Sequence, residues 1–281
     1  MENFRKVFFN ITRKCCFGSD YTQNESIELE GKSSLDITSS QIPPQQVVQI
    51  PLVYLHLKII VIESEKVPLG KTYNISPLGL NNTERTTYGD GCVYAGSLYQ
   101  ENNRIVNDII LPQNEKGVGK KHFMIQYKGE PKPLYLIKDL GDGMGTFVRI
   151  SKPLTLQTNF IISFGDSHMI IIIDNSYPPK LTLRFIDGPK LDEKFKFSQN
   201  DSPIIIGRMN DCTIRFEDNS LSRYHCIITY KDHWIIQDGD GNKISTNGTW
   251  LFVEDFFEIH NEMVFKVGET TFRTETFTAK Y

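Results

Sequence analysis

The sequence has no hydrophobic run long enough to cross a membrane. Its longest apolar stretches, such as Met169–Ile173, are far shorter than the roughly 20 residues that a membrane-spanning helix needs. It also has no surplus of positive charge, since 31 Lys and Arg residues are outnumbered by 34 Asp and Glu residues. No basic cluster stands out locally either, so we expect no transmembrane span and no nucleic-acid partner.

Cysteine is sparse and is not spaced as a metal ligand. The five cysteines are Cys15, Cys16, Cys92, Cys212 and Cys226. Their number is odd and no pair has zinc-finger spacing, which disfavours both a disulfide framework and a metal site. We therefore expect a reducing compartment, first of all the cytoplasm, with the nucleus or a cytoskeletal or ciliary assembly as alternatives.

No catalytic constellation is recognisable. No serine or cysteine lies in a nucleophile elbow. The segment Asp238–Asn242 begins like a calcium loop, but Lys243 replaces the required glycine and Thr249 replaces the glutamate that should close the loop. The sequence thus predicts a protein that is not an enzyme and that has no cofactor or metal.

The first 49 residues differ in amino-acid composition from the rest of the chain. In residues 1–17, apolar side chains recur at helical spacing beside Arg and Lys, which predicts a short amphipathic helix. Its use stays open between docking into a partner groove, peripheral contact with an anionic membrane through residues 1–17 with Cys15 or Cys16 acylated, a transit peptide, and a frayed tail. Residues 18–49 are rich in Ser, Thr and Gln and are typical of a polar linker, so residues 1–49 form one leader.

Most of the remaining chain consists of short runs of β-branched and aromatic residues separated by Gly, Pro, Asn and Asp. The runs are LHLKIIVI, DIILP, HFMIQY, LYLIKDL, FIISF and HMIIIID, followed by LTLRFI, PIIIG, CIITY, HWIIQD and MVFKVG. Such runs predict many short strands and little helix. The expected fold class is therefore all-β.

The strand-rich region is an internal repeat. His122 and His225, like Gly145 and Gly248, are separated by the same 103 residues, and so are two further pairs, Tyr127 with Tyr230 and Thr146 with Thr249. The two prolines in residues 175–180 discourage a continuing strand and mark the boundary. We predict two β-sandwiches in tandem, over residues 50–177 and 178–281.

Three motifs of the second repeat each follow or precede a predicted strand. They are IIIGR ending at Arg208, SLSRYH containing Ser222 and Arg223, and STNGTW containing Asn247. Loops at one end of a sandwich can meet, and guanidinium, hydroxyl and amide groups together suit a phosphorylated side chain with its three acceptor oxygens. Each motif alone is a common edge charge or hairpin turn, whereas all three in order favour a phosphopeptide site.

This ordered set resembles the forkhead-associated (FHA) domain, a β-sandwich that binds phosphothreonine peptides, over about residues 181–276. By that resemblance Arg208 and Ser222 contact the phosphate with Arg223 and Thr246 beside them, and Asn247 holds the peptide main chain. The resemblance also implies structural support of the site by Gly207, His225, Gly248 and Thr249, with His225 bracing the loops by hydrogen bonds. The expected fold is thus two tandem FHA-like β-sandwiches behind a short, mostly irregular leader.

The first repeat keeps the order of these motifs but lacks the residue types that would bind phosphate. At the matching places Ser97 replaces the arginine, Gly119 replaces the serine and Met144 replaces the asparagine. Losing three charge-assisted contacts, each worth roughly 1.5 to 3 kcal/mol, leaves little affinity for phosphate. Lys116, Lys120 and Lys121 leave some positive charge there, which is typical of a solvated loop. We therefore predict a degenerate, FHA-like first unit.

Together these patterns predict a non-catalytic adaptor. The second repeat would bind a phosphothreonine-containing protein, and the first would serve as a protein-docking unit. The alternative is a structural subunit of a large protein assembly in which both folds serve packing.

Overall fold

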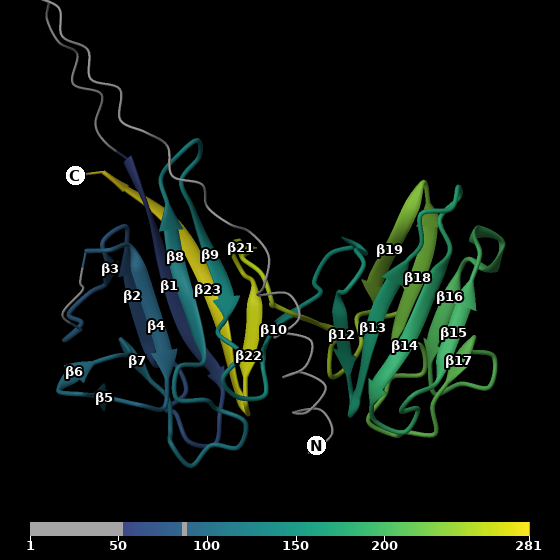
Figure 1. Ribbon diagram of the computed structural model, residues 1–281, viewed down its shortest axis with the longest axis horizontal. Helices are drawn as coiled ribbons and strands as arrows, with labels where there is room; N and C mark the ends of the chain where they lie inside the picture. Colours follow the sequence, from purple (N-terminus) through teal and green to yellow (C-terminus); the bar gives the residue numbers. More distant parts are fainter. Residues whose placement is uncertain (1–52, 86–88, 281) are drawn as a thin grey trace, which may run out of the picture.

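A computed structural model describes residues 53–85 and 89–280 (Figure 1). The predicted amphipathic segment and linker of residues 1–49 lie outside the described residues. Within the described ranges every predicted run forms a strand, and helical structure is limited to one 3₁₀ turn, η1 (Gln199–Asp201). The all-β prediction is confirmed. No helix in these ranges is long and apolar enough to cross a membrane.

Two β-sandwiches lie side by side and share one sheet of 11 strands (Figure 1). Its strand order is β15-β14-β13-β12-β20-β10-β22-β23-β1-β2-β3. Each sandwich is completed by its own five-stranded sheet, in the orders β21-β9-β8-β4-β7 and β11-β19-β18-β16-β17. We call the first the split sandwich, because it is built from residues 53–149 and 253–280, and the second the inserted sandwich, because it is built from residues 150–252.

The strands of the split sandwich are β1 (Val53–Glu63), β2 (Thr72–Ser76), β3 (Gly79–Leu80), β4 (Cys92–Gly96), β5 (Gln100–Glu101), β6 (Arg104–Ile105), β7 (Ile109–Ile110), β8 (Phe123–Lys128), β9 (Leu134–Asp139), β10 (Thr146–Arg149), β21 (Phe257–Ile259), β22 (Val264–Val267) and β23 (Thr270–Lys280). The strands of the inserted sandwich are β11 (Leu154–Thr155), β12 (Ile161–Phe164), β13 (Ser167–Ile173), β14 (Leu181–Asp187), β15 (Lys194–Phe197), β16 (Ile204–Gly207), β17 (Ile214–Arg215), β18 (Cys226–Lys231), β19 (His233–Asp238) and β20 (Trp250–Phe252).

The sandwiches and the predicted repeats divide the chain differently. The predicted ranges 50–177 and 178–281 would place each closing hairpin in its own repeat. Instead, β13 from the first repeat pairs with β14, and β23 from the second repeat pairs with β1. The two repeats have therefore exchanged their C-terminal hairpins. The first repeat passes into the other sandwich after β10 and the second repeat passes after β20. These two strands pair with each other.

Matching contacts fix both exchanged hairpins. Thr270 Oγ1 donates to Glu115 Oε1 at 3.0 Å, which ties the hairpin of the second repeat to a loop of the first. In the other sandwich, a Cβ on Gly165 would lie 3.1 Å from Asp218 Oδ2, so the hairpin of the first repeat lies against a loop of the second. The exchange is thus reciprocal.

The hydrophobic core follows the sandwiches and not the repeats. One cluster combines residues such as Leu57 and Phe123 with Phe265 and Phe272 from the far end of the chain. The other fills the inserted sandwich, where Phe164 of the first repeat packs edge-to-face against Phe185 and Phe216 of the second. Strands such as β9 and β19 alternate buried and half-buried residues, as expected where one face of a strand packs on a core. Each sandwich therefore needs residues from both repeats.

Candidate functional site

The three motifs of the second repeat lie at one edge of the inserted sandwich. β18 pairs antiparallel with both β16 and β19, and the register places Ile206, Cys226 and Asp238 side by side there. Because neighbouring antiparallel strands begin and end at the same sheet edge, the loops after β16, before β18 and after β19 all leave the sheet together. The predicted convergence of the three loops is present in the structure.

Backbone contacts join the first two loops. The Arg208 N–H donates to the Arg223 carbonyl oxygen at 3.1 Å. A Cβ on Gly207 would overlap that same carbonyl, so a residue with a side chain could not let the loops approach this closely. Gly207 therefore lies at the point where these two loops approach most closely.

Side-chain hydrogen bonds join the second and third loops. The Thr246 N–H donates to Ser222 Oγ at 3.0 Å, and Asn247 Nδ2 donates to the Ser220 carbonyl oxygen at 2.8 Å. Among the residues that the structure describes, the acceptor for the proton of Ser222 Oγ is the distant Thr246 Oγ1, at 3.5 Å. The Ser222 hydroxyl is thus accessible to a better acceptor, such as an oxyanion.

Exposure separates the two predicted groups of site residues. The residues expected to contact the ligand, Arg208, Ser222, Arg223, Thr246 and Asn247, are exposed or half-buried. The residues expected to support the site, Gly207, His225, Gly248 and Thr249, are buried. The structure therefore places the polar groups on the surface and their supports beneath them.

His225 connects two of the loops from below. Its Nδ1 accepts from the Ser222 N–H at 3.2 Å, and its Nε2 lies 3.1 Å from the Gly248 carbonyl oxygen, so a neutral ring with its proton on Nε2 satisfies both bonds. Burial lowers the His225 pKa, more than the Gly248 carbonyl and nearby carboxylates raise it. An imidazole ring that the fold favours in its neutral form is thus part of the scaffold.

Asp238 is a supporting residue that the motifs did not reveal. Its Oδ1 accepts from Ser245 Oγ and from Thr249 Oγ1, both at 2.6 Å. Asp139 accepts from Thr146 Oγ1 in the same way in the first repeat, at 2.8 Å. The signal in the sequence was an aspartate at the end of HWIIQD and the next-to-last position of LYLIKDL.

The surface of the site is rich in unneutralised guanidinium groups. Within the described residues, no carboxylate pairs with Arg208 or Arg223, whereas Arg215 in the same sandwich pairs with Glu217 at 3.5 Å. Cationic donors without partners attract an anion and avoid the loss of an existing ion pair on binding. The arrangement can therefore hold a dianionic group without any bond-breaking chemistry.

The corresponding edge of the first repeat is closed. The Met144 N–H donates to the Gly117 carbonyl oxygen at 2.8 Å, and Val118 forms a β-bridge with Gly143. These contacts bring the backbone of Asp142 so close to Gly119 that a Cβ at residue 119 would overlap the Asp142 carbonyl. Backbone thus occupies the place where Ser222 has its side chain in the second repeat.

Ser97 and His122 of the first repeat have structural contacts only. Ser97 is buried, and its Oγ donates to the Gly119 carbonyl oxygen at 3.1 Å. The Gly119 N–H donates to His122 Nδ1 at 2.9 Å, which repeats the bond between Ser222 and His225. The Nδ1 half of the histidine brace has therefore been kept, whereas His122 Nε2 has no hydrogen-bond partner among the described residues.

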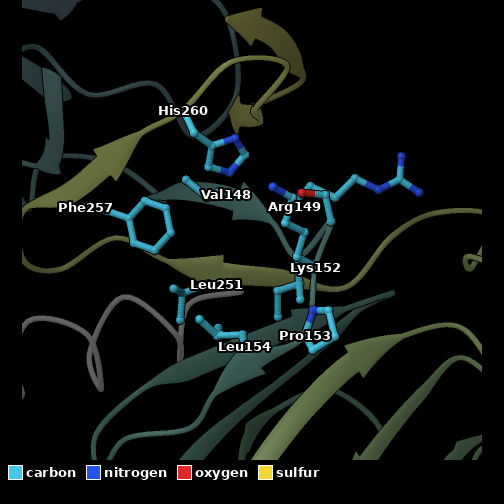
Figure 2. Close-up of a pocket in the computed structure, with 10 residues that line it drawn as sticks. Val148, Arg149, Lys152, Pro153, Leu154, Leu251, Phe257 and His260 are labelled. Carbon is cyan, nitrogen blue, oxygen red and sulfur yellow. The ribbon is translucent and has the colours of Figure 1, made fainter. Parts of the chain in front are cut away.

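Two pockets lie along the junction of the sandwiches. Figure 2 shows one of about 180 Å³ beside β10 and β20, where Leu154, Leu251 and Phe257 form an apolar wall. A hollow of about 1240 Å³ continues along the junction and shares Leu154, Leu251 and Phe257. None of the nine predicted site residues lines either pocket, so the candidate site lies outside both.

Comparison with known proteins finds the same family in both repeats. A sequence model of the FHA domain matches residues 101–165 and again residues 204–268. The chain is also 42% identical over 53 residues to the serine/threonine-protein kinase RAD53 of Saccharomyces cerevisiae. That alignment covers 19% of this chain and only 6% of the kinase. Both family matches run across the strand exchange, because they follow the order of the sequence and not the sandwiches.

Proposed function

Because this chain carries two FHA domains in tandem, we propose that it is a non-catalytic adaptor whose second repeat captures phosphothreonine-containing segments of a partner protein. FHA domains are non-catalytic binding modules for phosphothreonine peptides, which gives the ligand class. The observation that supports the proposal is the convergence of the Arg208, Ser222 and Asn247 loops on one exposed surface. The similarity to a kinase covers too little of either chain to support a catalytic function for this protein.

The roles follow from the donors that remain free. The guanidinium groups of Arg208 and Arg223 supply charge-assisted hydrogen bonds to the phosphate, and Ser222 adds its hydroxyl proton. Asn247 uses one amide N–H on the Ser220 carbonyl and keeps its oxygen and second N–H for the peptide main chain. Thr246 lies between these groups and shares its backbone N–H with Ser222.

The test is the Arg208→Ala variant of the full chain against an oriented library of phosphothreonine peptides and its unphosphorylated counterpart. We expect the wild type to bind only the phosphorylated library and the variant to bind at least about tenfold more weakly, because each charged hydrogen bond contributes roughly 1.5 to 3 kcal/mol. Thermal unfolding should be nearly unchanged, since Arg208 is exposed and has no ion pair.

The matched control is Arg215→Ala, which removes a guanidinium from the same sandwich but one already paired with Glu217. It should bind like the wild type. Equal capture of phosphothreonine peptides by the Arg208 variant would reject the assignment of the site, and capture of the unphosphorylated library by the wild type would reject the ligand class.

We assign the first repeat a docking role that does not require phosphate. Its matching loops are closed by the Val118–Gly143 bridge, and Lys121 is already paired with Glu101 at 2.9 Å. A partner held by this repeat should stay bound to the Arg208→Ala variant and after phosphatase treatment. Loss of every partner on either treatment would contradict this division of labour.

A further inference from the structure

Arg149, a residue of the first repeat, contacts the site of the second. It is the last residue of β10, and the pairing of β10 with β20 places it opposite Trp250, directly after the loop that carries Thr246 and Asn247. Its Nη2 donates to the Ser245 carbonyl oxygen at 3.1 Å. The contact exists only because the hairpin exchange has brought β10 and β20 together.

The guanidinium also packs on the backbone of the same loop. Gly248 has a φ of 79°, and a Cβ there would lie 2.9 Å from Arg149 Nε and 3.1 Å from Trp250 Nε1. Trp250 Nε1 in turn donates to the Asn247 carbonyl oxygen at 2.9 Å. Arg149 and Trp250 therefore hold the loop on either side of Gly248.

Support from the second repeat alone reaches other atoms of this loop. Asp238 accepts from Ser245 Oγ, which itself accepts from the Gly248 N–H at 3.0 Å. These bonds fix the Ser245 side chain and the Gly248 N–H, while Arg149 is the donor to the Ser245 carbonyl. Without Arg149 that carbonyl loses its side-chain partner, and the chain before Thr246 is less restrained.

The Arg149 side chain is directed away from the apolar pocket beside it. Figure 2 shows Val148, Leu154 and Leu251 around that pocket, with the Arg149 guanidinium extending away from them. Within the described residues no carboxylate pairs with it. Its half-buried position and free charge therefore serve the loop and not an ion pair.

We propose that Arg149 is a positioning residue for the phosphothreonine site, acting through the Ser245–Gly248 loop. The inference rests on the proposed function of that site. A loop held in its binding conformation before the ligand arrives loses less conformational freedom on binding, so the brace raises affinity without touching the phosphate. The first repeat thereby takes part in ligand binding by the second.

The experiment compares Arg149→Met with Lys152→Met in the full chain. Lys152 is an exposed cation three residues away, so its variant removes the same charge but none of the loop contacts. With phosphothreonine peptides from the library, Arg149→Met should bind about tenfold more weakly, as expected for the loss of one supporting charged hydrogen bond, and Lys152→Met within about twofold of wild type. The NMR signals of the Trp250 indole and the Asn247 carboxamide should shift in the free Arg149→Met protein and not in the control.

Arg149→Lys separates bracing from simple charge. Lysine keeps the charge but lacks the planar face on Gly248, so it should restore less than half of the lost binding free energy. Full restoration by lysine, or wild-type affinity in a folded Arg149→Met protein, overturns the positioning role. If Arg208→Ala abolishes binding while Arg149→Met does not, only this inference fails. If the wild type binds no phosphothreonine peptide, the proposed function fails and this inference falls with it.

Discussion

At the scale of single residues, Gly119 and Ser222 show why one repeat is open and the other closed. Both donate their backbone N–H to the ring of the following histidine, at 2.9 and 3.2 Å. Only Ser222 has a side chain facing a neighbouring loop, whereas Gly119 lies directly against the Asp142 backbone. The identity of residue 119 is thus fixed by packing.

This geometry predicts that Gly119→Ser does not create a second phosphate site. The new Cβ overlaps the Asp142 carbonyl, so the loops must move apart, at a cost of about 1 to 3 kcal/mol in the free energy of unfolding. Urea unfolding measures the loss. The control is Gly129→Ser, where the nearest atom to a new Cβ is 3.7 Å away and stability should be nearly unchanged. A stable Gly119→Ser protein that gains phosphopeptide binding through its first repeat would disprove this account.

The sequence indicated the three loops that meet in the structure, but not every residue that contacts them. Arg208, Ser222 and Asn247 could be found because they lie in short motifs at strand ends. Arg149 could not, because it lies about 100 residues away in the other repeat and reaches the loop only through the pairing of β10 with β20. A sequence motif contains only residues that are close along the chain. The contact of Arg149 with the loop depends instead on which strands pair.

At the scale of elements, the strands were predictable from sequence and their partners were not. Strand β13 of one hairpin and strand β22 of the other both alternate buried with less buried residues, so either hairpin has a suitable face for either sandwich. Periodicity indicates which face of a strand is buried, not which edge it joins. The choice is made by specific contacts such as the one between Thr270 and Glu115, and by Pro153, which favours an extended chain where the first repeat crosses over.

The exchanged hairpin β12–β13 carries a residue that should make stability depend on pH. His168 on β13 lies 5.8 Å from the ring of Phe147 on β10, and burial lowers its pKa from 6.5 to about 4. The folded state therefore disfavours the protonated ring. Its contribution to stability is complete above pH 6.5 and is lost as the pH falls toward 4.

We predict that wild type loses up to about 3 kcal/mol more stability than His168→Phe between pH 7.5 and pH 4.5, since one pKa unit corresponds to about 1.4 kcal/mol. Urea unfolding of both proteins at the two pH values gives the difference directly, because the other titrating groups are common to both. Parallel pH profiles for the two proteins would show that His168 is not held neutral by the fold.

At the scale of the whole molecule, the strand exchange makes one sandwich a continuous insertion in the other. Residues 150–252 supply every strand of the inserted sandwich, and its core has no contribution from residues before 150 or after 252 except the half-buried Phe257. Residues 178–281, the second repeat as predicted from the sequence, lack β12 and β13. They keep β22 and β23 but not β1 and β10, with which those two strands pair.

We therefore predict that residues 146–252, which retain β10 and Arg149, unfold cooperatively as an isolated fragment and bind phosphothreonine peptides, while residues 178–281 do not. Circular dichroism during urea unfolding and fluorescence anisotropy with labelled peptides measure the two properties. A monomeric 178–281 fragment that folds and binds as tightly as the full chain would mean that the hairpins are not exchanged in solution.

The pairing of the first and last described strands has a mechanical consequence. In the split sandwich, Val53 of β1 lies opposite Lys280 of β23, so tension applied through these two points would separate the pair one hydrogen bond after another, like a zipper. The inserted sandwich lies outside that line of force. A stretched molecule would therefore open its split sandwich before its inserted sandwich.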